Sequence, residues 1–105
     1  MTDITQLHRA LVARVLDSDG TSPAKLRRAA FDNAGLSEPI RTLIGKVAYR
    51  AYSVTDEDVA AVRAAGLSED QIFEIVVCAA IGQANRQYIG ALAAVASATG
   101  EWDRQ

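Results

Sequence analysis

Three side chains in one apolar segment are the candidates for chemistry in this 105-residue chain. Glu74 and Cys78 stand four residues apart, so on a helix they share a face, and Arg86 follows two turns later. A thiolate attacks electrophiles, a carboxylate transfers protons and a guanidinium holds anions. Glu74 and Cys78 are therefore the candidate catalytic residues, and Arg86 is a candidate ligand-binding residue.

The surroundings of Cys78 favour packing over catalysis. It lies in the middle of the most apolar stretch, residues 72–81, where a buried thiol has a raised pKa and is inert. A carboxylate one turn away raises that pKa further, so Glu74 and Cys78 do not form an activated nucleophile. Glu74 itself has two interpretations, an acid with an elevated pKa that transfers protons, or an exposed residue at the helix edge.

Arg86 and the neighbouring Asn85 interrupt this apolar helix. Arginine keeps its charge, so a buried Arg86 needs an acid, a carbonyl group or an anionic ligand. Two interpretations follow. One is a salt bridge within the chain or between subunits, with Glu57, Asp58 or Glu74 as possible partners, and the other is ligand binding in which Asn85 adds hydrogen bonds.

Two tyrosines are further candidates for ligand binding. Tyr49 and Tyr52 stand one turn apart and are expected to share a helix face, either as packing residues with hydrated hydroxyl groups or as the lining of a ligand pocket. His8 is the only histidine and is expected at the surface, at the edge of the first apolar stripe. Without a second histidine or a spaced His/acid set, no metal site and no cofactor are expected.

The elements that must position these residues are about five helices, because twenty alanines and helical spacing of apolar residues favour an all-α fold. Residues 55–58 and 68–71 are capping-box patterns, and Gly66 between them is a helix stop. The earlier helices are expected to begin at three capping residues, followed by proline in two cases: Asp3, Ser22 and Ser37. The basic residues of the second helix are expected to form a solvated face, with an anion site as the alternative: Lys25, Arg27 and Arg28.

The final helix is predicted over residues 69–98, with a frayed tail at 100–105. Its first half is apolar on all sides, as in a helix that is central or that packs against another subunit. Gly82 and Gly90 each weaken a helix by roughly 1 kcal/mol relative to alanine, so they are expected at close approaches between helices or at a break. We therefore expect a homo-oligomer formed through this apolar C-terminal helix.

Composition limits the class of protein. Residues 1–105 are expected to form a single domain, half of the residues are hydrophobic, and the net charge of −2 argues against nucleic-acid binding. The single cysteine and the absence of a signal-peptide pattern favour a cytoplasmic protein. The longest apolar run is far shorter than the roughly 20 residues of a membrane span.

Residues 54–59, 67–75 and 85–86 resemble the alkylhydroperoxidase D-like and carboxymuconolactone decarboxylase-like superfamily. Residues 27–31 and 47–49 are similar to those of its short stand-alone members. The resemblance implies a compact all-α bundle of the alkylhydroperoxidase D type with a long central C-terminal helix. It also implies assembly into dimers, trimers or hexamers.

The chain departs from the peroxidase branch of that superfamily, which uses a Cys-x-x-Cys pair with a nearby histidine and an upstream glutamate. No Cys-x-x-Cys is present, and His8 is far from Cys78 in sequence. The expected function is therefore that of a non-redox member that binds a small organic ligand, or of a purely structural member. The alternative is an enzyme of the superfamily, with peroxidase-related or lactone decarboxylase-type activity, that uses Cys78 alone or Glu74 with Arg86 and Tyr49.

Overall fold

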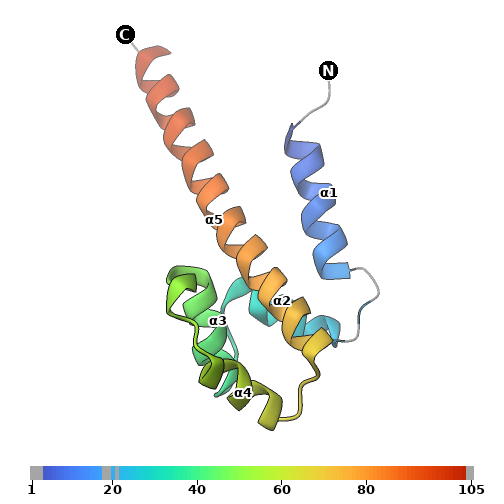
Figure 1. Cartoon of the computed structure of the whole chain (residues 1–105). Coiled ribbons are helices and arrows are strands. Elements are labelled where there is room, and N and C mark those ends of the chain that lie inside the picture. Colours follow the sequence, from blue (N-terminus) through green and yellow to red (C-terminus); the bar gives the residue numbers. More distant parts are fainter. Residues whose placement is uncertain (1–3, 18–19, 21, 104–105) are drawn as a thin grey trace.

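The computed structural model describes residues 4–17, 20 and 22–103, and these residues form five α-helices, one short 3-10 helix and no β-strand. The elements are α1 (Ile4–Asp17), α2 (Ala24–Asp32), α3 (Ile40–Tyr49), the 3-10 helix η1 (Ala51–Ser53), α4 (Asp56–Ala64) and α5 (Glu69–Asp103). Figure 1 shows α2, α3 and α4 gathered around the first half of α5. Helix α1 lies alongside α5 and runs in the opposite direction. The prediction of an all-α fold with a long final helix is confirmed. The predicted cap at Asp3 lies outside the described residues.

Local hydrogen bonds place the starts of α4 and α5 where the sequence predicts them. Thr55 and Asp58 form a complete capping box, in which each side chain accepts the backbone N–H of the other residue. Ser68 and Gln71 exchange the same pair of bonds at the start of α5. Gly66 has a φ of 111°, a backbone conformation that is unfavourable for residues with a Cβ atom. It ends α4 as expected.

Helices α2 and α3 begin differently from the prediction. Pro23 and Pro39 occupy the capping positions, and no side chain caps either helix. The Ser22 hydroxyl donates instead to the Gln71 carbonyl oxygen at 3.4 Å, so tertiary contact with α5 replaces the expected cap. At the start of α3 it is the backbone carbonyl of Ser37, rather than its side chain, that accepts the Arg41 N–H.

The core follows one face of α5. Its buried residues there recur at spacings of three and four and meet buried residues of the other helices. The α5 members are Ile72, Ile75, Cys78 and Ala79. The facing members are Leu16, Ala30, Phe31, Leu43, Ile44 and Val62. Burial is confined to this face within one chain, and Phe73 on α5 is 70% exposed.

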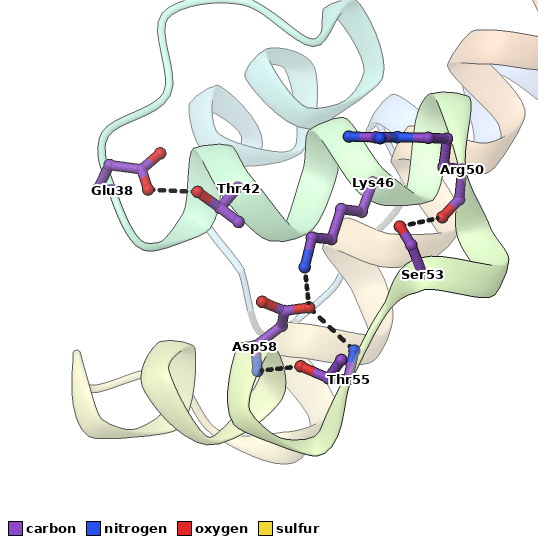
Figure 2. A network of polar contacts seen from close by, with 7 residues as sticks. All are labelled: Glu38, Thr42, Lys46, Arg50, Ser53, Thr55 and Asp58. Atoms are coloured by element: carbon purple, nitrogen blue, oxygen red, sulfur yellow. Dashed lines mark hydrogen bonds and ion pairs between the residues drawn. The ribbon is translucent and has the colours of Figure 1, made fainter.

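A polar network joins α3 to α4 (Figure 2). Lys46 donates to the Asp58 carboxylate at 2.7 Å, and the same carboxylate accepts the Thr55 N–H at 2.9 Å. The hydrogen bond from Lys46, followed by that from Thr55, holds the pKa of Asp58 below its usual range. The capping box of α4 is thereby also a tertiary contact. In the adjacent hydrogen bond, the Thr42 hydroxyl in the first turn of α3 donates to the carboxylate of Glu38, which precedes that helix.

The helix α5 is longer than predicted, since it runs unbroken to Asp103 through both glycines. A Cβ atom at Gly82 would lie 1.9 Å from the Phe31 carbonyl oxygen, so this glycine marks the predicted close approach between helices. No atom of the same chain lies within 4 Å of the corresponding position at Gly90, so no close approach is made there within one chain, and the prediction of a break is wrong.

Candidate functional site

The residues with chemistry gather at a cavity of about 250 Å³ between α1, α2 and the first half of α5, called here the first cavity. Its lining consists of Arg14, Val15, Arg27, Phe73, Glu74, Val77 and Cys78. The four α5 residues follow the spacing of one helix face, as predicted for Glu74 and Cys78. The two arginines come from α1 and α2, so only the tertiary structure brings them to that face.

Sequence reasoning missed Arg14, and for Arg27 it favoured a solvated face over an anion site. Arg27 is only 6% exposed, and its Nη1 donates to the Val15 carbonyl oxygen at 3.4 Å, so the prediction of a solvated basic face is wrong for Arg27. Lys25 and Arg28 are exposed as expected. A signal was present in the sequence, because Arg27 stands three and four residues before the buried Ala30 and Phe31 and therefore shares their face.

Glu74 is half-buried and is held by the segment that precedes α2. The Ser22 N–H lies 3.2 Å from one carboxylate oxygen and 3.5 Å from the other, and the Ser22 hydroxyl lies 3.5 Å away. Gly20 leaves room for this position of the carboxylate, since a Cβ atom there would lie 2.0 Å from Glu74 Oε1 and the Glu74 side chain would have to shift. The carboxylate is thus fixed at the wall of the cavity.

Cys78 is 2% exposed, and its Sγ lies 4.0 Å from the Val15 carbonyl oxygen. Burial raises the pKa of the Cys78 thiol; the Arg27 charge acts in the opposite direction, and the Glu74 charge raises the pKa further. The thiol therefore stays protonated at neutral pH, as expected for a packing residue.

We expect iodoacetamide to alkylate Cys78 in the folded chain more slowly than in urea at pH 7, by about tenfold or more, because burial keeps the thiol protonated and shields it from the reagent. The rate in the folded chain should climb as pH rises toward the raised pKa. Mass spectrometry of quenched samples measures both rates. Equal rates in the folded and unfolded chain would contradict the burial of Cys78.

Arg86 does not line the first cavity. Its Nη1 donates to the Phe31 carbonyl oxygen at 2.7 Å, and its Nε and Nη2 lie 3.2 Å and 3.0 Å from Gln83 Oε1. The partner of Arg86 is thus a carbonyl group at the end of α2, one of the three kinds expected, and not one of the predicted acids. Asp58 pairs instead with Lys46, and Glu74 with Ser22.

Asn85 belongs to a second cavity of about 380 Å³, between α1 and the later part of α5. Its side-chain oxygen is hydrogen-bonded to His8 Nε2, and the His8 ring lies against the Tyr88 ring with centroids 4.4 Å apart. His8 is therefore half-buried between two helices, where the sequence predicts a surface residue. The remaining lining is Arg9, Val12, Ala13, Ile89 and Leu92.

The two candidate tyrosines lie apart from both cavities. Tyr49 ends α3 and is 66% exposed, whereas Tyr52 lies in η1 and is 88% exposed. The chain turns between them, so the expectation of one shared helix face is wrong. The alternative catalytic set of Glu74, Arg86 and Tyr49 is not brought together.

Neither a metal centre nor a membrane-spanning helix occurs among the described residues. No group of three or more His, Cys, Asp or Glu residues in that part of the chain is placed to hold a metal ion. None of the described helices has the length and hydropathy needed to cross a membrane.

Comparison with protein-family models, curated proteins and solved structures found no match for this chain. The resemblance to the alkylhydroperoxidase D-like superfamily thus stays a prediction.

Proposed function

We propose that this chain is a small cytoplasmic homo-oligomeric protein of the carboxymuconolactone decarboxylase-like kind that binds a small organic ligand without redox chemistry. The observation that carries the proposal is the convergence of Arg14, Arg27 and Glu74 on the first cavity from three helices. Two guanidinium groups and one carboxylate give this lining one net positive charge. Phe73 and Val77 supply an apolar wall, so the cavity suits a small organic anion with an apolar part.

Titration calorimetry with a panel of small carboxylates and their neutral amides tests this proposal. Replacing Arg14, which is exposed on α1, with glutamine is expected to weaken carboxylate binding by about tenfold or more, the usual effect of a lost charge-assisted hydrogen bond. Arg9→Gln is the matched control, because Arg9 is also exposed on α1 but lines the second cavity. Equal losses in the two variants, or no preference for carboxylates over amides, would contradict the assignment. A cavity that binds no member of the panel would favour the structural role.

A second candidate function is catalysis in the same cavity, with Glu74 as the proton acceptor. Glu74 favours it because this carboxylate lines the cavity and is positioned by the Ser22 N–H. A thiol mechanism has less support, since the pKa of Cys78 is raised. Turnover that survives Cys78→Ser and is lost in Glu74→Gln would support this function, and loss in Cys78→Ser would contradict it.

The homo-oligomer is supported by the surface that one chain exposes. The accessible surface is 7194 Å², whereas a compact monomer of 11.2 kDa exposes roughly 5,700 Å². The radius of gyration is 16.6 Å, against about 13 Å for a compact domain of this length. Light scattering across a dilution series tests the proposal, and a monomer at every concentration would contradict it.

A further inference from the structure

The later part of α5, over residues 89–99, exposes large apolar side chains to solvent and carries no charge to offset them. Residues 89–99 include no charged side chain, and every one of them is exposed. Three of them are large and apolar, namely Ile89, Leu92 and Val95, each between 46% and 62% exposed. Figure 1 shows this part of α5 extending beyond α2, α3 and α4, with only α1 alongside it. An exposed run of helix with no charge and three large apolar side chains is typical of an interaction surface, which points to a covering partner.

Helix α1 contributes to the same surface. Leu7 is 58% exposed and Leu11 is 47% exposed, next to the second cavity that α1 and α5 line together. The two helices run in opposite directions and diverge toward the chain ends in Figure 1. Two antiparallel helices with exposed apolar residues form half of a four-helix bundle, and they have no second layer against which to bury those residues.

We propose that a second copy of this chain covers this surface, so that α1 and α5 of two copies form a four-helix bundle around a two-fold axis. The inference rests on the homo-oligomer proposed above and names the surface that makes it. A two-fold interface places the same patch on both sides, and an uncharged apolar patch meets its own copy without repulsion. Charged residues are depleted at the centre of such interfaces, as they are in residues 89–99.

The area favours a protein partner over a small ligand. The whole chain exposes about 1,500 Å² more than a compact monomer does, which is enough to supply the roughly 800 Å² per partner of a standard interface. A small molecule in the second cavity would cover Ile89 and Leu92, which line it. It would leave three exposed apolar side chains uncovered, because they do not line that cavity: Val95, Leu7 and Leu11.

Sedimentation velocity on the whole chain and three variants tests the proposal. The wild-type chain is expected to have the mass of a dimer, and its Tm is expected to rise with protein concentration. Val95→Glu and Leu11→Glu are expected to weaken association on the order of a hundredfold or more, because each dimer would bury two unpaired carboxylates. Ala80→Glu is the matched control, since residue 80 is exposed on α5 away from this surface. Far-UV circular dichroism reports whether each variant folds.

The possible outcomes separate the surface from the homo-oligomer. A folded monomer for Val95→Glu and Leu11→Glu, with a dimer for Ala80→Glu, supports the proposal. If both variants unfold, a concentration-dependent wild-type Tm supports it and a constant Tm overturns it. A dimer that survives both substitutions overturns this surface and leaves the homo-oligomer standing. A trimer or larger assembly overturns the two-copy bundle. A wild-type monomer overturns both proposals and means that something other than a second copy covers the surface.

Discussion

Replacing Gly82 with alanine is expected to destabilise the chain by about 3 kcal/mol or more, although alanine is the better helix former. The three atoms nearest to the added methyl group all belong to the Phe31 backbone, and they lie at 1.9, 2.7 and 2.9 Å. Backbone atoms cannot turn away as a flexible side chain can, so α2 and α5 must separate. These helices hold most of the core, which makes the loss a large part of a typical stability of 5–15 kcal/mol.

Gly45→Ala is the matched control for this prediction. It makes the same substitution inside another helix, α3, where no atom lies within 4 Å of the added methyl group. We therefore expect a gain of roughly 1 kcal/mol from helix propensity alone. Urea unfolding monitored by circular dichroism measures both variants. Similar changes of the unfolding midpoint in the two variants would contradict the close approach of α2 and α5 at Phe31.

Replacing Arg86 with methionine is expected to cost about 2 kcal/mol, because the Phe31 carbonyl oxygen loses a charge-assisted hydrogen bond. That oxygen lies 2.7 Å from Arg86 Nη1, at the carboxyl end of α2, where carbonyl groups lack partners within the helix and favour positive charge. Methionine keeps a long apolar stem of similar reach, so the change mainly removes the guanidinium. The same urea experiment measures the loss.

Two comparisons make the Arg86 result specific. Gln87→Met, at the exposed neighbouring position, is expected to be neutral within about 0.5 kcal/mol. Arg86→Lys keeps the positive charge but removes the planar guanidinium, which bonds to Phe31 and Gln83 at the same time. We therefore expect an intermediate loss of stability. A neutral Arg86→Met would contradict the capping role. Weaker carboxylate binding with unchanged stability would instead favour the ligand-binding interpretation of Arg86.

The Phe31 carbonyl oxygen is the point at which both predictions meet. Gly82 allows α5 to approach it, and Arg86 supplies the hydrogen bond that the approach makes possible. The two residues stand four positions apart and therefore share a face of α5. The polar interruption that the sequence singles out is thus a device that joins α2 to α5, and the candidate site lies two turns earlier, around Glu74 and Cys78.

Features that depend on neighbours in the chain were determined by the sequence alone. The capping boxes at Thr55 and Ser68 and the stop at Gly66 use partners three residues away or a single backbone conformation, so their residue types suffice to predict them. The pairing of Glu74 with Cys78 on one helix face follows from the same local geometry. The all-α class follows because these signals repeat along the whole chain.

The tertiary structure alone decided which of several equivalent residues meet a partner. Gly82 and Gly90 are the same residue on the same helix, yet only Gly82 faces α2. Arg27 lies inward while Arg28 is exposed, and Ser22 bonds to α5 in place of capping its own helix. Residue type sets what a side chain can bond to, but the partner depends on how the helices pack, which no local pattern encodes. For this reason the sequence predicts five helices and a shared face for Glu74 and Cys78, while the arginines that complete the cavity follow from the packing of α1 and α2 on α5.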